Sequence, residues 1–277
     1  MIPFTKAHAC GNDFLIVSEE DAAGHDLAAL TRSLCQRNTG VGADGVEFFA
    51  WINESGPAPR SGRIRLHNAD GSIAEISGNG TRCVAVWMAE SLGSKPGDTL
   101  EIATAAGVRN CQIVSVRNQN EFSVDVTTAM GVPRFVPHTL KLIDGVEVVG
   151  VEVSTGNPHF VILVETPDFA VGHRAWAGIG AEICAHRDFP KQTNVEFVRV
   201  VDEHEIEIRI FERGVGPTSS SGTGSSAAAT AALALRRCLS PLKVVAPGGA
   251  QTVAWDGPGA ELYLTGPATL IARGEAW

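Results

Sequence analysis

Two short segments place a serine directly before a glycine-rich stretch, and their residue types suit the binding of an anion. They are Ser77-Gly78-Asn79-Gly80 and Ser221-Gly222-Thr223-Gly224. An alanine-rich run over residues 225–235 follows the second, and alanine has the highest helix propensity of all residues. Because a helix start presents unpaired N–H groups and the positive end of the helix dipole, we expect both segments to bind a carboxylate or phosphate. A flexible glycine–serine linker is the alternative for the second segment.

The two halves of the chain repeat one plan, in which strands and an asparagine-bearing turn precede the serine segment. Asn12 lies in the first such turn, and Asn157 precedes Pro158, which favours an extended residue before it. If both segments face one cleft, a small anion would lie between two helix starts, with a serine on either side. Two groups on opposite sides of one carbon are what a racemase or epimerase needs. His159, next in the chain, is either a functional group or a core histidine.

The apolar periodicity predicts a mixed α/β chain of short strands and a few helices. Residues 53–62 are rich in Pro, Gly and Ser and predict an exposed loop, and residues 130–137 lie near the boundary between the halves. We expect one domain over 1–118 plus 266–277 and a second over 119–265, with the active site in the cleft between them. Helices are expected at 27–37, 81–92, 172–185 and 225–235, and strands at 15–17, 46–52, 63–67, 100–104, 108–116, 122–126, 146–153, 160–164, 192–198, 205–211, 243–246, 251–255, 261–265 and 268–274.

Composition excludes several classes of function. The chain has 277 residues, 44% of them hydrophobic and 19% charged, which is typical of a globular protein of two domains. It has no apolar run near the roughly 18 residues of a membrane span and begins without a signal peptide, so we expect a cytoplasmic protein. The net charge of −9, with no basic run, argues against binding to nucleic acid. Six scattered cysteines without a CxxC pair indicate neither a zinc site nor a disulfide framework.

The motifs, taken in order, resemble the diaminopimelate epimerase family over nearly the whole chain. That resemblance implies an α/β (α+β) fold of two pseudo-symmetric domains, each a mixed β-sheet or barrel wrapped around a central helix. It further implies a homodimer, an active site that needs neither cofactor nor metal, and a small amino acid or dicarboxylate as substrate. The motifs are Gly11-Asn12-Asp13-Phe14, Gly40-Val41-Gly42-Ala43-Asp44, Asn68-Ala69-Asp70-Gly71-Ser72, Gly78-Asn79-Gly80-Thr81-Arg82-Cys83, Gly156-Asn157-Pro158-His159, Asn194-Val195-Glu196-Phe197, Glu212-Arg213-Gly214 and Gly222-Thr223-Gly224.

The same resemblance implies roles for individual residues. His159 and Glu212 would support the two catalytic groups, which correspond in position to Ser77 and Ser221. An amino acid also needs N–H groups and Arg213 for its carboxylate, and Glu212 and asparagine oxygens for its ammonium. The substrate-binding residues carried over from the family are Asn12, Asn68, Gly78, Asn79, Asn157, Asn194, Glu212, Arg213, Gly222 and Thr223.

The chain departs from the family at its chemical centre. The family's two catalytic cysteines correspond to Ser77 and Ser221, and Gly45 and Pro217 stand where a glutamine and a glutamate are usual. A thiol of pKa about 8.5 supplies a thiolate near neutral pH, whereas a serine hydroxyl needs an added base. Cys83 matches a non-catalytic position of the family and lies about one helical turn away. The serines are either engineered or native to a divergent branch.

These observations predict an isomerase that moves a proton at carbon. The resemblance implies conversion of LL- to meso-diaminopimelate, a step toward lysine and peptidoglycan. The alternatives are an isomerase of another small carboxylic or amino acid, with Glu212, His159 or another carboxylate as base, and a homologue that binds an amino acid without turning it over. A phosphate-binding nucleotide enzyme is disfavoured, because neither glycine segment carries a Walker lysine.

Overall fold

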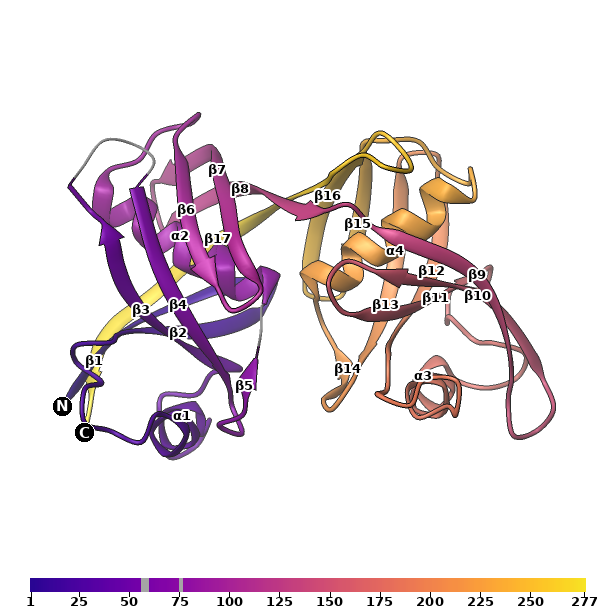
Figure 1. The fold of residues 1–277 in the computed structure, drawn as a ribbon, viewed down its shortest axis with the longest axis horizontal. Coiled ribbons are helices and arrows are strands. Elements are labelled where there is room, and N and C mark those ends of the chain that lie inside the picture. Colours follow the sequence, from indigo (N-terminus) through magenta and orange to yellow (C-terminus); the bar gives the residue numbers. More distant parts are fainter. Residues whose placement is uncertain (56–59, 75–76) are drawn as a thin grey trace. The chain divides into compact units, whose positions relative to one another are not determined.

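The chain folds into two compact units. The computed structural model describes residues 1–55, 60–74 and 77–277. The first unit comprises Met1–Ala129 with Thr265–Trp277, and the second is Met130–Leu264 (Figure 1). The returning C-terminal segment was expected from residue 266, but the first boundary lies at 129/130 rather than 118/119. The reason is that strand β8 (Phe122–Gly131) pairs antiparallel with β7 (Gly107–Asn118) and so belongs with the first unit.

The strands of the first unit close on themselves around helix α2 (Gly78–Leu92). β2–β3 and β4–β6 pair parallel, and β1–β2, β3–β4, β6–β7 and β7–β8 antiparallel. β17 pairs with both β1 and β8, which closes the ring. α2 packs against β1, β2, β6 and β7, and its buried side chains form the core. The remaining strands are β1 (Ile2–Ala9), β2 (Asn12–Ser18), β3 (Gly45–Asn53), β4 (Arg60–Asn68), β5 (Ile73–Ala74), β6 (Thr99–Thr104) and β17 (Leu262–Ala276).

The second unit wraps its strands around helix α4 (Gly222–Ala234) in the same manner. Neighbouring strands follow the order β9, β10, β11, β12, β13, β15, β16, with β14 beside β13. Five of the six alanines of α4 are fully buried against these strands, because only small side chains let a helix lie so close to a sheet. The strands are β9 (Arg134–Lys141), β10 (Glu147–Ser154), β11 (Pro158–Val164), β12 (Asn194–Asp202), β13 (Glu205–Glu212), β14 (Gly216–Thr218), β15 (Leu242–Ala246) and β16 (Gly249–Trp255).

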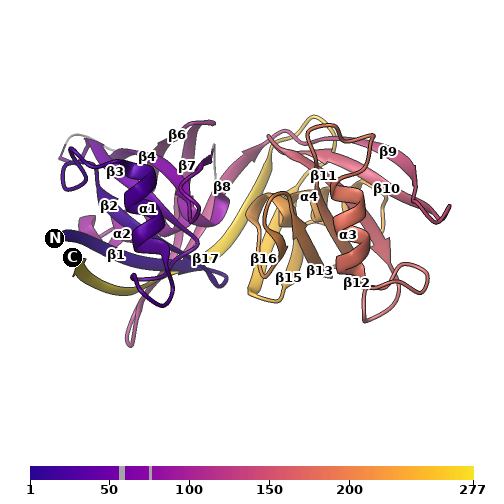
Figure 2. The same cartoon turned by 90° about the horizontal axis from the view of Figure 1, so that it is seen from below.

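A second helix covers the outside of each unit. α1 (Leu27–Cys35) packs on β3 and β4, and α3 (Trp176–Cys184) packs on β12 and β13, as Figure 2 shows. Both helices are shorter than the expected 27–37 and 172–185. Asp26 caps the start of α1 by accepting two backbone N–H groups. None of the described helices combines the length and the hydropathy of a transmembrane span.

The expected repeat is present as a shared topology, and the mixed α+β fold class is confirmed. In the first unit β2 runs parallel to β3, which pairs antiparallel with β4; in the second, β11, β12 and β13 do the same. Phe14 is paired with Gly45 in the first arrangement, and His159 with Asn194 in the second. The two serine-capped helices follow these strands at corresponding places in each unit.

Several elements differ from those expected. β9 occupies part of the stretch taken for a boundary, and β14 lies within the glycine–serine loop. The two strands expected at the C-terminus are one long strand, β17. Positions 56–59 of the expected loop, and 75–76 before Ser77, lie outside the described residues.

Candidate active site

Ser77 begins helix α2 as its N-cap. Its backbone is extended, and its Oγ accepts the N–H of Gly80 at 3.0 Å. The hydroxyl of Thr81 donates to the Ser77 carbonyl at 2.8 Å, which further fixes this turn. The N–H group of Gly78 lies ahead of the first intrahelical hydrogen bond, as is general at the start of a helix. The first serine segment therefore forms a helix N-terminus, as expected.

Ser221 begins helix α4 in the same way. Its Oγ accepts the N–H of Gly224 at 3.2 Å, and the hydroxyl of Ser226 donates to the Gly222 carbonyl at 2.9 Å. Ser221 is buried, and its backbone is again extended. The linker alternative for this segment is wrong, because the chain passes directly from the loop into a buried helix. In both units the serine oxygen is occupied as an acceptor by its own helix.

Asn12 and Asn79 meet beside the α2 N-terminus. Asn79 Nδ2 donates to Asn12 Oδ1 at 3.1 Å, and Asn12 Nδ2 donates to Asp44 Oδ2 at 2.6 Å. Arg82, which is fully buried, donates to Asn79 Oδ1. These bonds fix the orientation of both amides. Asn68, the other asparagine expected here, lies at the end of β4 and donates to Ser72 Oγ at 3.0 Å.

A charged network holds the loop that carries Asp44. Arg37 reaches Asp13 at 2.9 Å and Asp44 at 2.6 Å, and Lys6 reaches Asp13 at 3.0 Å. Burial raises the pKa of Asp13, but its hydrogen bonds to Arg37 and Lys6 outweigh this and hold that pKa below the ordinary value. The Asp13 carboxylate therefore stays charged, and Arg37, which binds both aspartates, keeps Asp44 beside Asn12.

In the second unit a continuous chain of polar contacts leads from the core to Ser221. Glu196 Oε1 lies 2.7 Å from His159 Nδ1, and both side chains are fully buried. His159 Nε2 lies 2.9 Å from Asn157 Oδ1. Asn157 Nδ2 donates to Thr223 Oγ1 at 3.4 Å, and that hydroxyl lies 3.4 Å from Ser221 Oγ. Four of the expected site residues, Asn157, His159, Ser221 and Thr223, thus form one cluster.

Asn194 joins the start of β12 to the loop after β13. Its Oδ1 accepts the N–H of Arg213 at 2.9 Å, and its Nδ2 donates to the Pro158 carbonyl at 3.2 Å. The Arg213 guanidinium donates to the Lys191 carbonyl at 3.2 Å. Glu212 is the last residue of β13, paired with Gly216. The expected site residues divide between the two units. Asn12, Asn68, Ser77, Gly78 and Asn79 lie in the first unit, and Asn157, His159, Asn194, Glu212, Arg213, Ser221, Gly222 and Thr223 lie in the second.

Two buried glutamates were not among the expected site residues. Glu47 and Glu196 occupy matching places on β3 and β12, two residues beyond Gly45 and Asn194. Burial raises the pKa of Glu47 to about 8. Burial also raises the pKa of Glu196, although His159 opposes the shift. The sequence feature that could have indicated them is a single acidic residue between apolar residues of a strand, since a buried carboxyl is rare. It occurs in Val46-Glu47-Phe48 and in Val195-Glu196-Phe197.

The six cysteines, which all lie among the described residues, are buried, and none is in a disulfide bond. Burial raises the pKa of Cys83 well above its ordinary value, and raises those of Cys35 and Cys111 to about 12 and about 11. A thiol with a raised pKa is a poor source of thiolate. Cys83 is therefore not a ready source of thiolate beside Ser77.

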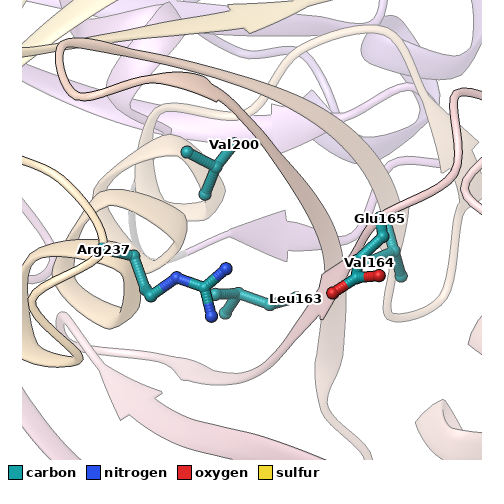
Figure 3. Close-up of a pocket in the computed structure, with 5 residues that line it drawn as sticks. All are labelled: Leu163, Val164, Glu165, Val200 and Arg237. Carbon is teal, nitrogen blue, oxygen red and sulfur yellow. The ribbon is translucent and has the colours of Figure 1, made fainter.

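Other places in the second unit do not contribute to this cluster. Figure 3 shows a cavity of about 250 Å³ lined by Leu163, Val164, Glu165, Val200 and Arg237. It lies at the far end of β11 and β12 from His159 and Asn194. The described residues contain no group of three or more His, Cys, Asp or Glu side chains that could hold a metal ion.

Fold and site together define a racemase- or epimerase-type isomerase with one serine-capped helix N-terminus in each unit. The family model for diaminopimelate epimerase matches residues 4–136 and 151–271, and the chain belongs to that family. The diaminopimelate epimerase of Pseudomonas syringae pv. syringae (strain B728a) is 34% identical over 288 residues, covering 99% of each chain. That of Pseudomonas entomophila (strain L48) is 35% identical with the same coverage.

Solved structures share the fold at lower identity. A phenazine biosynthesis protein of the PhzF family from Bacillus anthracis has a TM-score of 0.71 at 19% identity, with 99% of this chain and 98% of that chain covered. A probable proline racemase from Agrobacterium radiobacter K84 has a TM-score of 0.70 at 15% identity, with 99% and 92% covered. At these identities the likeness concerns the fold alone.

Proposed function

We propose that this isomerase moves a proton at the α-carbon of a small amino acid, using protein groups alone. The observation that carries the proposal is the pair of serine-capped helix N-termini, each with ordered asparagines beside it, at matching places in the two units. Free N–H groups at a helix start stabilise the negative charge that develops on a carboxylate when its α-proton leaves.

The expected binding roles follow from the same arrangement. The N–H groups near Gly78 and Gly222, with Arg213, would bind carboxylate, and Asn12, Asn68, Asn157, Asn194 and Glu212 would bind ammonium. The fixed amides of Asn12 and Asn79 support this assignment, because an amide held by neighbouring residues loses little freedom on binding.

Diaminopimelate is the first substrate to test, because the curated relatives are diaminopimelate epimerases. The resemblance places Ser77 and Ser221 where that family has catalytic cysteines, so we propose that the chain belongs to a divergent branch. Another small amino or carboxylic acid is the alternative substrate. A base other than a thiolate would then act, and His159 is the candidate that the second-unit cluster favours.

The test is incubation with LL- and meso-diaminopimelate in deuterated water, followed by proton NMR and chiral analysis. The proposal predicts loss of the α-proton signal. If neither isomer exchanges, diaminopimelate is removed as substrate, and the same assay on other small amino acids then decides the reaction class.

Restoring the thiols tests the correspondence of Ser77 and Ser221 to the family's bases. Ser77→Cys together with Ser221→Cys is expected to raise epimerisation of diaminopimelate, because a thiolate at a helix N-terminus is a far better base than a serine hydroxyl. Ser220→Cys, beside the cap, is the matched control. Absence of any gain in the double variant would show that the pocket has diverged as well as the bases.

A further inference from the structure

The two units differ chemically at one matching place. In the first unit Phe14 is paired with Gly45, and Glu47 lies two residues further along β3. In the second unit His159 is paired with Asn194, and Glu196 lies two residues further along β12. Both glutamates are fully buried. Among the residues that the structure describes, an imidazole lies against the buried carboxyl in the second unit but not in the first.

The surroundings of the two carboxyls reflect this difference. Glu196 has His159 at 2.7 Å. Neither carboxyl oxygen of Glu47 has a hydrogen-bond partner among the residues that the structure describes. Each carboxyl lies against the third residue of the serine-capped helix: a Cβ on Gly80 would stand 2.1 Å from Glu47 Oε1, and one on Gly224 would stand 2.9 Å from Glu196 Oε1. The two carboxyls are thus placed alike against their helices, and the two units differ in the imidazole of His159 beside Glu196.

The hydrogen bonds of His159 fix where its protons lie. Asn157 meets Nε2 with its amide oxygen, which can only accept, so Nε2 carries a hydrogen. One further proton lies between Nδ1 and Glu196, either on the ring or on the carboxyl. Whether that proton lies on the ring or on the carboxyl, His159 and Glu196 together carry no net charge. His159 thus presents an N–H toward the helix N-terminus and has a carboxyl behind it.

We propose that His159, oriented by Glu196, is the proton-transfer group of the second unit, and that Glu196 is a positioning residue. This rests on the proposed function, which it deepens by naming the base. The first unit has Phe14 at the matching position, and none of its described residues hydrogen-bonds the Glu47 carboxyl. The two units are therefore chemically unequal partners in the reaction.

The transfer balances without any further reactant. Asn157 Oδ1 occupies the point 2.9 Å from Nε2 that a substrate atom must take, and the amide's long 3.4 Å bond to Thr223 is the contact that a bound carboxylate would replace. With Asn157 displaced, the hydrogen on Nε2 first passes to the solvent. The substrate Cα–H bond then breaks, its hydrogen forms an N–H bond at Nε2, and the electron pair stays on the substrate as a carbanion. The imidazole keeps its Nδ1 hydrogen on the Glu196 carboxylate throughout. In the reverse direction the Nε2–H bond breaks and its hydrogen returns to the carbon on the same face.

A proton-transfer group in one unit alone predicts that α-proton exchange and inversion of the α-carbon proceed at different rates. A group on one side of a carbon removes and returns hydrogen on the same face. For one stereoisomer of the substrate, deuterium should enter from the solvent faster than the centre inverts. An enzyme with two matched bases would instead place deuterium mainly in the inverted product.

The experiment compares Glu196→Gln with Glu47→Gln, a matched pair of buried carboxyl losses in the same fold. We expect Glu196→Gln to slow α-proton exchange of diaminopimelate by about 10²-fold or more, as losing an orienting carboxylate does, with KM changed less than about threefold. The acid limb of its pH–rate profile should move. Glu47→Gln should exchange within about threefold of the wild-type rate, with an unmoved profile.

A second measurement needs no substrate. The His159 ring N–H resonance, assigned by its absence in His159→Gln, should be protected from solvent in the wild type and in Glu47→Gln, and shifted or lost in Glu196→Gln. If Glu196→Gln does not fold, Glu196→Asp replaces it and should retain part of both signals.

An unchanged exchange rate and profile in Glu196→Gln would overturn the proposal, as would an unchanged ring resonance. If the wild type exchanges no diaminopimelate isomer, the named substrate fails, while the resonance comparison still decides whether Glu196 positions His159.

Discussion

At the scale of single residues, Ser77 and Ser221 serve their helices directly. Each hydroxyl oxygen accepts an N–H from the third helical residue, which is the role of an N-cap. A serine in that position holds the helix start in place but supplies no accessible anion. The chemistry must therefore come from neighbouring groups, and His159 with Glu196 is the buried pair that lies nearest to Ser221 along a continuous chain of contacts.

Glu47 makes the stability of the first unit depend on pH. Its pKa is raised by burial from 4.5 to about 8, so the folded state holds a proton that the unfolded state releases. Stability should then fall as pH rises from about 4.5 to about 8, by up to about 1.4 kcal/mol per pH unit, and stay level above that range. Glu47→Gln should remove this fall, as measured by urea unfolding at several pH values.

The control is Glu19→Gln, which removes a carboxyl that pairs with Arg63 and Arg65 at the surface. It should keep the fall in stability between about pH 4.5 and about 8, because Glu47 is still present. Equal slopes in wild type and Glu47→Gln would contradict the assigned burial of this carboxyl.

Residue types were informative where their chemistry is local. The serines, Asn12 and Asn157 were singled out by turn and cap chemistry, whereas the roles of His159 and the other asparagines came from the resemblance to the family. The structure places each of them within its own unit. Glu47 and Glu196 were missed, because one acidic residue inside an apolar strand reveals neither what covers it nor which imidazole lies across the sheet. Those facts depend on strand pairing between segments far apart in the sequence.

At the scale of elements, the third residue of α2 must be glycine for a packing reason. A Cβ on Gly80 would lie 2.1 Å from Glu47 Oε1 and 3.2 Å from Ser77 Cβ. Gly80→Ala should therefore lower the free energy of unfolding by about 1–3 kcal/mol, as overpacking of a core does. Thermal and urea unfolding measure this loss.

Gly178 in α3 is the matched control, because a Cβ there meets no atom within 4 Å. Gly178→Ala should raise stability by about 0.5–1 kcal/mol through helix propensity alone. Equal effects at the two positions would contradict the close packing of α2 on Glu47.

Helices and strands with clear periodicity were predicted near their observed places, and the alternating strand β13 (Glu205–Glu212) is an example. The sequence did not reveal β14, because Gly216-Pro217-Thr218 has turn chemistry and becomes a strand only by pairing with β13. β17 was divided in two, because Gly266-Pro267 favours a break that its neighbouring strands override.

At the scale of the whole molecule, the second unit is built from one continuous segment, Met130–Leu264, with its own buried core around α4. A fragment of residues 130–264 should therefore fold alone and unfold in one cooperative transition by circular dichroism. A fragment without such a transition would contradict the division into units.

The first unit has no such independence. It needs Thr265–Trp277 to place β17 between β1 and β8, so residues 1–129 alone should expose two strand edges and aggregate. The sequence revealed the C-terminal return, but it placed the first boundary too early, because the pairing of β8 with β7 is not visible as a pattern.

The most direct test of proton transfer at carbon is the α-proton signal of LL-diaminopimelate in deuterated water, followed with the wild type and with His159→Asn. We expect exchange by the wild type and a rate lowered by about 10²-fold or more in His159→Asn. Exchange that is unaffected by His159→Asn would contradict the assigned base. Thermal stabilisation by the amino acid, with no exchange of it or of any other small acid, would show a binding protein and contradict the proposed reaction.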